Sequence, residues 1–399
     1  MRRFLEDFMR NFLFGTGNFG QVVLHCVKNA GINVDAFIDL NEKNVGKKIG
    51  GLPVIDIKEV EKDSKIIIAS NRNNYSYLHS LLVKYGLTNF QDCDEFLSNI
   101  DFETLEVDWS KERIESEIKT HLSRASNIKS GNKKLVVNSI DVVVTEKCSL
   151  KCKDCSNLMQ YYEKPKNAEV EELSKDLFLI LNSVDQVNEL RFIGGEPLLV
   201  KSIYEFIENT SNFKNFNELV VFTNGTIIPS DEKMRMMSDP RIRFQISDYG
   251  ISLSKRVKNL IQALSKFKIR YVVDRVTTWQ NCATIEPKER TPEQNLSVFA
   301  NCCVNDAFTL LHGRLYGCPF SAHAENLQAI PHAAGDSFEL EDRSEGETRE
   351  GFKKLMSKVF YQACKYCNGR DYTVSTVDAA VQTKKPLKYD KVIKLNAIL

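Results

Sequence analysis

Short apolar runs alternate with amphipathic, helix-like stretches through the middle of the chain. Five of these runs are expected to form strands, at residues 140–144, 189–193, 219–223, 242–246 and 269–273. Strands that alternate with helices predict a parallel sheet with crossover helices, hence an α/β fold containing a complete or partial α/β barrel. Its functional site is expected at the carboxyl ends of the strands.

The N-terminal part shows the same alternation on a smaller scale. A strand runs into a helix through Gly15, Gly17 and Gly20, and the next strand ends at Asp39. Such a turn presents a helix N-terminus to phosphate, and an acidic residue at that place binds a ribose. We therefore expect residues 1–95 to form a Rossmann-like domain with a possible nucleotide or nucleotide-sugar site. The same fold would also arise if the domain served only for packing or dimerisation.

Composition places limits on the partners. Charged residues make up 27% of the 399 residues and nearly cancel, leaving a formal charge of +1. Such a balance provides no broad field for nucleic acid or an anionic membrane, so small molecules are the expected partners. The sequence contains no apolar run of about 18 residues and no signal-peptide pattern, which predicts a cytoplasmic protein. Its 11 cysteines are then more naturally metal ligands and free thiols than disulfides.

Three cysteines follow the strand at 140–144. Cys148, Cys152 and Cys155 are separated by three and two residues, so one short loop can present three soft sulfur ligands to an iron–sulfur cube. Three ligands leave the fourth iron open to bind and polarise another molecule. A zinc knuckle is the alternative, although zinc sites usually pair two CxxC-like elements.

A glycine turn follows the second expected strand of the barrel. It reads Gly194-Gly195-Glu196-Pro197, and glycines allow a backbone to approach a ligand closely. The acidic side chain suits a cationic group. The cysteine spacing and this turn together resemble the radical S-adenosylmethionine (radical SAM) superfamily.

That resemblance implies a 4Fe-4S cluster whose open iron is chelated by S-adenosylmethionine. It also implies that S-adenosylmethionine is cleaved to a 5′-deoxyadenosyl radical, which takes a hydrogen atom from the substrate. It also implies that the Gly194 to Pro197 turn holds the SAM ammonium group. By their order after the next strands, Asn224, Ser247 and Asp248 correspond to further SAM-binding positions. In the family the residue before the third cysteine is often aromatic and lies near the adenine, whereas this chain has Asp154.

A second cysteine set lies in the C-terminal region. Cys318, Cys364 and Cys367, with either Cys302 or Cys303, give four sulfur ligands, enough to close a cube. The spacing resembles a SPASM domain in its shorter twitch form, which implies an auxiliary 4Fe-4S cluster. A structural zinc site with the same ligands is the alternative. We expect a helical linker at 96–135, the radical SAM barrel at 136–285 and the auxiliary-cluster domain at 286–399.

The N-terminal domain resembles those of sugar acyltransferases, which favours a carbohydrate-like, perhaps nucleotide-activated substrate. The expected outcome is dehydrogenation, with the auxiliary cluster as electron acceptor, or epimerisation, with a cysteine such as Cys282 as hydrogen donor. An electron donor of the flavodoxin or ferredoxin type is implied. The alternatives are a peptide-modifying radical SAM maturase and a zinc-binding regulatory or scaffold protein. His312, His323 and His332 are possible proton-transfer groups, and the sequence assigns no role to any of them.

Overall fold

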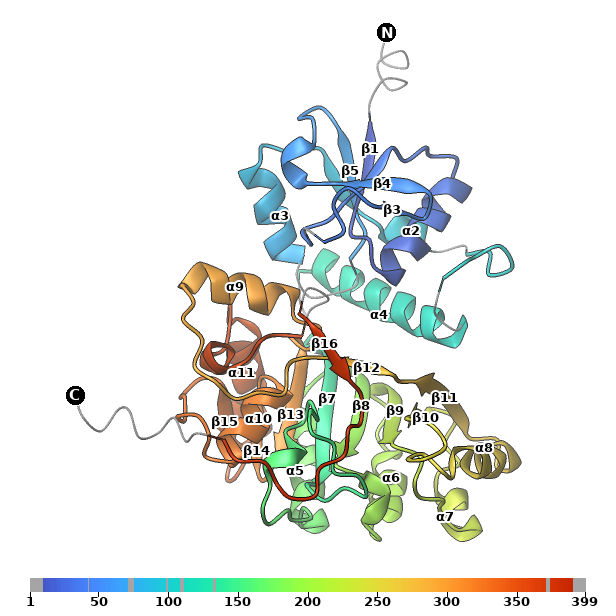
Figure 1. Cartoon of the computed structure of the whole chain (residues 1–399), viewed down its shortest axis with the longest axis vertical. Helices are drawn as coiled ribbons and strands as arrows, with labels where there is room; N and C mark the ends of the chain where they lie inside the picture. Colours follow the sequence, from blue (N-terminus) through green and yellow to red (C-terminus); the bar gives the residue numbers. More distant parts are fainter. Residues whose placement is uncertain are drawn as a thin grey trace, which may run out of the picture. The chain divides into compact units, whose positions relative to one another are not determined.

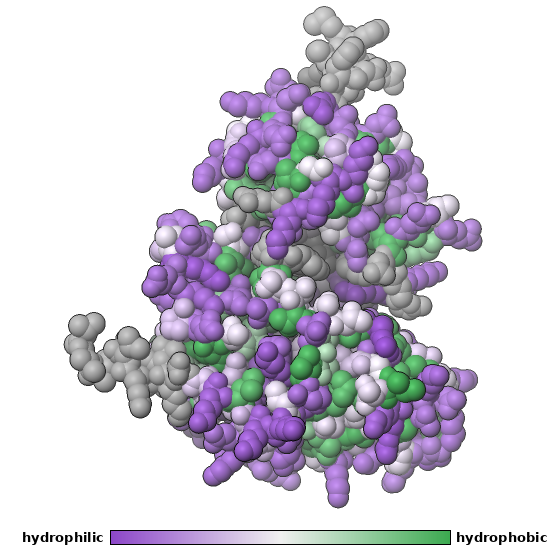
Figure 2. Space-filling view, in the orientation of Figure 1, coloured by the Kyte–Doolittle hydropathy of each residue, from purple (hydrophilic) through white to green (hydrophobic). Residues whose placement is uncertain are grey.

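The computed structural model divides the chain into two compact units, residues 1–133 and 134–399. It describes residues 10–41, 43–70, 75–97, 100–107, 111–131, 134–370 and 374–389. Each unit has its own sheet and its own hydrophobic core (Figure 1). Figure 2 shows hydrophilic residues over most of the visible surface, with hydrophobic residues scattered between them. In the described part of the chain, no helix is long and apolar enough to cross a membrane.

The first unit is built on a sheet of order β3-β4-β2-β1-β5-β6. Neighbouring strands are parallel except β3 and β4. The strands are β1 (Asn11–Phe14), β2 (Ala36–Ile38), β3 (Lys48–Ile49), β4 (Leu52–Ile55), β5 (Lys65–Ile68) and β6 (Phe90–Asp92). The helices are α2 (Asn18–Asn29), α3 (Tyr75–Lys84) and α4 (Lys111–Lys129), with short η1 (Ile57–Glu59) and η2 (Asp94–Phe96).

Apolar side chains on both faces of this sheet are buried, as the continuous apolar runs of β1 and β5 predict. Leu13 contributes to a core with helices α2 and α4, whereas its neighbours Phe12 and Phe14 contribute to a second core with α3. Helices on both faces of a mostly parallel sheet confirm the Rossmann-like fold. Helix α4 falls in the segment expected as a linker and packs into this unit through Ile114 and Ile118.

The second unit contains a sheet of order β11-β10-β9-β8-β7-β13-β14-β15. The first six strands in this order, β11, β10, β9, β8, β7 and β13, pair in parallel. The last two, β14 and β15, are added in antiparallel pairing. These strands are β7 (Val136–Thr145), β8 (Gln186–Gly194), β9 (Phe216–Thr223), β10 (Ile242–Asp248), β11 (Arg270–Arg275), β13 (Ala307–Leu311), β14 (Arg314–Tyr316) and β15 (Ser337–Glu339). A separate antiparallel pair joins β12 (Thr278–Gln280) to β16 (Thr376–Asp378).

The longer helices of this unit are α5 (Val170–Ser183), α6 (Ile203–Thr210), α7 (Asp231–Met236), α8 (Val257–Lys266), α9 (Pro292–Asn301), α10 (Pro319–Asn326) and α11 (Glu345–Met356). Short turns η3 (Met159–Tyr161), η4 (Pro197–Leu199) and η5 (Gln362–Tyr366) complete it. All five strands expected from the sequence are present and parallel, which confirms the α/β fold class. The expected boundary between residues 285 and 286 lies inside this unit, because β13 pairs directly with β7.

The two faces of the central sheet differ. Ile140, Val142 and Val144 of β7 point into a large apolar core with the crossover helices. The alternate positions on the other face carry charges that form ion pairs, within a strand for Arg191 and between strands for Arg243. Arg191 lies 2.7 Å from Glu189, and Arg243 lies 3.1 Å from Glu218. The inner face of the partial barrel is therefore polar, which suits a ligand rich in hydrogen-bonding groups.

Candidate functional site

The first cysteine set lies where the sequence predicts it, in the loop directly after β7. The thiols of Cys148, Cys152 and Cys155 interact with one another electrostatically, so one loop brings them together. Burial raises the pKa of Cys148 to about 12 and that of Cys152 to about 11. Metal binding nevertheless deprotonates such a thiol, because the bond to the metal stabilises the thiolate.

The glycine turn at the end of β8 packs onto the base of this loop. The amide of Gly195 donates to the carbonyl of Thr145 at 2.9 Å, and that of Glu196 donates to the carbonyl of Lys147 at 2.9 Å. A Cβ atom on Gly194 would lie 2.2 Å from the carbonyl oxygen of Thr145, and one on Gly195 would lie 2.3 Å from that of Lys147. Only glycine fits at either position, so the turn and the cysteine loop form one tightly packed edge.

The Glu196 carboxylate points into the protein. Both oxygens accept from the Thr223 hydroxyl, at 2.9 and 3.0 Å, and one also accepts from the backbone amide of Asn224 at 2.8 Å. The side chain is fully buried, and burial raises its pKa to about 7. The carboxylate thus links the ends of β8 and β9 through hydrogen bonds within the protein.

Asn224, at the end of β9, contacts the cysteine loop directly. Its Nδ2 atom lies 3.6 Å from the Cys148 sulfur and 3.0 Å from the Ser149 hydroxyl. Its backbone oxygen accepts from Ser254, which also contacts the carbonyl of Ser247. The structure therefore brings three sequence-predicted positions, Cys148, Asn224 and Ser247, to the same edge of the sheet.

The end of β10 adds an aromatic residue to this edge. The hydroxyl of Tyr249 interacts electrostatically with all three thiols of the first set. Its ring meets Trp279 edge-on, with centroids 5.6 Å apart. Asp248 instead pairs with Arg275 at 2.9 Å, so its carboxylate is already engaged. Tyr249 carries no signal of its own in the sequence, and only its proximity in space to the three thiols identifies it.

A C-terminal segment closes over the first cysteine loop. The Gln382 side chain donates to the Cys152 sulfur at 3.2 Å and accepts from the amide of Lys151 at 2.8 Å. The amide of Thr383 donates to the carbonyl of Lys151 at 2.7 Å. Nothing in the sequence marks this contact, because the two segments are 230 residues apart.

The second cysteine set also converges. Cys302 ends α9, Cys318 begins α10, and Cys364 and Cys367 flank the end of η5. Each of these thiols interacts electrostatically with at least two of the others, whereas Cys303 is exposed and interacts with Cys302 and Arg370. Between the two candidates that the sequence left open, the structure favours Cys302.

Two further groups lie between the cysteine sets. The Cys282 thiol is buried and interacts with Cys155 of the first set and Cys367 of the second. Arg370 interacts with thiols of both sets and donates to the carbonyl of Ser156. The sequence offered Cys282 as a hydrogen donor, and its position beside the first set is compatible with that role. Arg370 carries no local sequence signal.

Both cysteine sets fit iron–sulfur clusters in the chemistry of their donors. One loop supplies three thiols and no fourth, and the other set supplies four from three segments. Among the described residues, no three His, Cys, Asp or Glu side chains are spaced as ligands of a single metal ion.

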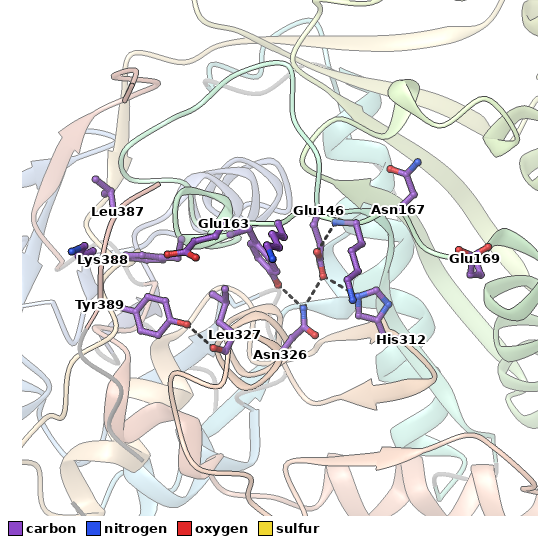
Figure 3. A pocket seen from close by; sticks show the side chains of 14 residues that line it. Glu146, Glu163, Asn167, Glu169, His312, Asn326, Leu327, Leu387, Lys388 and Tyr389 are labelled. Atoms are coloured by element: carbon purple, nitrogen blue, oxygen red, sulfur yellow. Dashed lines mark hydrogen bonds and ion pairs between the residues drawn. The ribbon is translucent and has the colours of Figure 1, made fainter. Parts of the chain in front are cut away.

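A polar pocket of about 760 Å³ lies beside the start of the first cysteine loop. Figure 3 shows the Glu146 carboxylate close to His312 and Asn326, from which it accepts hydrogen bonds at 2.9 Å and 2.8 Å. Lys166 donates its backbone amide to the second oxygen, and Tyr389 forms another wall. The His312 hydrogen bond and the two neighbouring donors hold the pKa of Glu146 below its usual range despite burial.

A hydrogen-bonded chain leads from this pocket into the core. Asn326 Nδ2 donates to the hydroxyl of Tyr162 at 2.9 Å, and that hydroxyl lies 2.9 Å from Nδ1 of His323. Since the Tyr162 hydroxyl accepts from Asn326, it can donate its own proton to Nδ1 of His323. Nδ1 is then an acceptor, so the ring proton of the neutral imidazole is on Nε2. The Nε2 atom is buried and has no partner among the described residues. Burial lowers the pKa of His323 to about 3, so the ring is neutral.

The N-terminal glycines form a compact strand-to-helix turn. A Cβ atom on Gly20 would lie 2.0 Å from the carbonyl oxygen of Gly15, so helix α2 packs directly against the turn. Asp39 lies beside the turn and accepts from Thr16, Asn41 and Asn44. Its carboxylate is thus used by the chain itself, and a ribose would have to share it.

Two protein-family models match the chain. The model described as "4Fe-4S single cluster domain" matches residues 137–240, which contain the first cysteine set and the glycine turn. The model described as "CoA binding domain" matches residues 9–77 of the first unit. The C-terminal cysteines lie outside both matches.

Curated relatives match the same central region. The GTP 3',8-cyclase of Clostridium acetobutylicum is 32% identical over 100 residues, which cover 24% of this chain and 30% of that protein. The GTP 3',8-cyclase of Clostridium botulinum strain Hall is 30% identical over 153 residues, covering 32% of this chain and 44% of that protein. The chain thus spans less than half the length of these relatives.

Solved structures with similar folds include BtrN in complex with AdoMet and 2-DOIA, which is 17% identical in sequence. The match covers 63% of this chain and 98% of that chain, with a TM-score of 0.41. Another is anSMEcpe with bound AdoMet, which is 14% identical in sequence. The match covers 65% of this chain and 94% of that chain, with a TM-score of 0.39. The two family matches, the parallel sheet and the three-cysteine loop agree with the expected architecture, in which a Rossmann-like domain is followed by an α/β region similar to 4Fe-4S cluster domains and to part of the GTP 3',8-cyclases.

Proposed function

We propose that this chain is a radical SAM oxidoreductase or epimerase that acts on a hydroxyl-rich, carbohydrate-like substrate. The observation that carries the proposal is the loop of Cys148, Cys152 and Cys155, whose three thiols leave one iron of a cube open at the carboxyl end of a parallel sheet. When bound, the cluster and SAM supply hydrogen-atom abstraction from an unactivated C–H bond.

The chain's own residues would bind and orient the cofactor. The backbone of Gly194 and Gly195 packs closely against the start of the cysteine loop, and Asn224 contacts that loop through Cys148. We assign the adenine side of the site to the Tyr249 and Trp279 pair, since Asp154 stands where the family often has an aromatic residue. Ser247 and Asp248 complete the set, with Asp248 acting together with its Arg275 partner.

The four thiols of Cys302, Cys318, Cys364 and Cys367 are proposed to bind a second, fully ligated 4Fe-4S cluster. A cluster with no open iron carries electrons rather than substrate, so it would accept the electron of a substrate radical during dehydrogenation. A flavodoxin or ferredoxin-type protein is the expected electron source for the first cluster. Epimerisation would instead need a hydrogen donor, for which buried Cys282 is placed between the two sets.

The substrate class rests on the polarity of the interior. The inner face of the sheet carries paired arginines and carboxylates, and His323 Nε2 and Arg370 Nε are buried without partners in the described part of the chain. Buried polar atoms require hydrogen bonds, and hydroxyl groups of a sugar-like ligand can provide them. Considered by itself, the Rossmann-like domain is proposed to bind a nucleotide or nucleotide sugar through Gly15, Gly17, Gly20 and Asp39.

The test begins with iron and sulfide analysis of anaerobically reconstituted protein, beside a variant with alanine at all three first-set cysteines. We expect about eight irons in the parent and about four in the variant. Reduced parent protein with SAM should form 5′-deoxyadenosine, and the variant should form none. Nucleotide sugars are then screened for SAM-dependent turnover. Zinc in place of iron, or a parent without SAM cleavage, would refute the proposal.

A further inference from the structure

Arg370 is the side chain that connects the two cysteine sets. It lies three residues beyond Cys367 of the second set, and its guanidinium donates to the carbonyl of Ser156, directly after Cys155 of the first set. A single residue thus holds the segment that carries the second set against the loop that carries the first. The proposed function uses only its Nε atom, as a hydrogen-bond donor to substrate, and assigns no role to its charge.

The surroundings of this guanidinium are rich in sulfur. It interacts electrostatically with Cys155 of the first set, with Cys302 and Cys367 of the second, and with Cys282 between them. Cys303 and Cys318 also face it. Most of the groups that face Arg370 are therefore cluster ligands or thiols beside them.

The other titratable groups around Arg370 do not neutralise it by contact. Asp141 interacts with it at longer range and lies 3.8 Å from Arg191 instead. His323 is buried and neutral, and adds no negative charge. In the described residues Arg370 forms no ion pair with a carboxylate, and its Nε atom is buried without a partner.

We propose that Arg370 is a shared positive charge that raises the reduction potentials of both clusters and so favours electron uptake at each. Reduction adds one negative charge to a cluster, and a buried cation nearby stabilises the reduced form because screening by water is weak there. Arg370 is in this sense a positioning and tuning residue, with no direct part in the chemistry. The inference rests on the two clusters of the proposed function.

The test is a redox titration of the reconstituted full chain, followed by electron paramagnetic resonance. The signals of the two clusters are assigned with the variant that has alanine in place of Cys148, Cys152 and Cys155. For Arg370→Gln we expect reduction of each cluster to become about tenfold less favourable, a shift of about 59 mV to lower potential for a one-electron couple. Arg370→Lys keeps the charge and should leave both potentials near the parental values.

Arg290 provides a matched control. Its guanidinium donates to the backbone carbonyls of Cys364 and Cys367 of the second set, and among the described residues it has no hydrogen bond to the first set. Arg290→Gln should therefore shift the second cluster alone. The inference is wrong if Arg370→Gln shifts neither potential or only one, or if the Lys variant shifts as much as the Gln variant.

Two outcomes separate this inference from the proposed function. A parent with fewer than two clusters refutes the proposed function before any variant is measured. If Arg370→Gln fails to retain iron, the Arg370→Lys variant decides. Parental iron content and parental potentials in the Lys variant support the shared charge. Loss of iron in the Lys variant as well shows that Arg370 acts through its hydrogen bond to Ser156, and overturns the inference.

Discussion

At the scale of single residues, steric space decides which side chains are possible beside the first cysteine loop. Gly195→Ala places a Cβ atom 2.3 Å from the carbonyl oxygen of Lys147. This oxygen belongs to the backbone, so relieving the clash requires the chain itself to shift, which costs free energy. We expect a loss of about 1–3 kcal/mol in the free energy of unfolding, since overpacking of this size has that cost. Reconstituted iron should fall as well, because Cys148 lies next to Lys147.

Urea unfolding and iron analysis check this prediction. Gly346→Ala is the matched control, because a Cβ atom there meets nothing within 4 Å. It lies in the first turn of α11 and should be neutral or slightly stabilising. Equal stability of the two alanine variants would show that the turn relaxes freely.

A second residue-scale prediction concerns the buried hydroxyl of Tyr162. Tyr162→Phe removes the partner of His323 Nδ1 and one partner of Asn326, both buried or half-buried. We expect a loss of about 1–3 kcal/mol in the free energy of unfolding, because polar groups are then left without hydrogen bonds. Tyr271→Phe, at an exposed tyrosine, should cost far less.

Nitrogen NMR of the His323 ring gives a readout beyond stability. In the parent the ring should be neutral, with its proton on Nε2, through the whole range in which the protein is folded. In Tyr162→Phe the proton should redistribute between the two nitrogens. An unchanged ring spectrum would mean that the Tyr162 hydroxyl does not set the tautomer.

At the scale of elements, α5 carries an acidic residue whose ionisation opposes folding. Burial, and then the neighbouring charge of Glu172, raise the pKa of Asp176 from 3.8 to about 6. The folded state therefore binds this proton more tightly than the unfolded state. The resulting stability is present below pH 4 and is lost as the pH rises through about 6.

Asp176→Asn should remove this loss. Because the side chain is half-exposed, we expect the variant to gain only about 1 kcal/mol over the parent at pH 8, and nothing at pH 4. Glu172→Gln should give a smaller gain of the same sign. Denaturant unfolding at several pH values measures these gains in the free energy of unfolding. If that free energy differs between the parent and Asp176→Asn by the same amount at every pH, the assigned pKa shift is contradicted.

Elements also show which parts of the site the sequence could predict. The strands, the loop of Cys148 to Cys155 and the glycine turn depend on local signals: apolar runs, short cysteine spacing and adjacent glycines. Cys302 and Cys303 are neighbours of the same type, so only the direction of each side chain at the end of α9 distinguishes them. Gln382 and Arg370 contact the first loop from more than 200 residues away, and no local pattern records such contacts.

At the scale of the whole molecule, the sequence indicated more domains than the structure contains. Residues 286–399 were expected as a separate domain, yet β13 extends the central sheet beside β7. Pairing between strands so distant in the chain leaves no periodic signal. The expected linker contains α4, whose apolar positions are too few for a clear pattern and are recognised only by their packing against the first unit.

Two units with separate cores should unfold separately. Residues 1–133 have two core clusters of their own, and residues 134–399 contain both cysteine sets. A ligand that binds only the folded state stabilises only the unit that holds it. Calorimetry of the full chain should therefore show two transitions, of which removal of iron lowers only the one belonging to residues 134–399.

The assignment of the transitions needs a change confined to the first unit. Ile67→Ala, in β5, creates a cavity in that core and should cost about 2–5 kcal/mol. It should lower the transition that iron removal leaves unchanged, without altering iron content. If iron removal lowers both transitions by the same amount, or if only one transition occurs, the two units are energetically coupled. The cysteine sets would then stabilise the Rossmann-like domain as well.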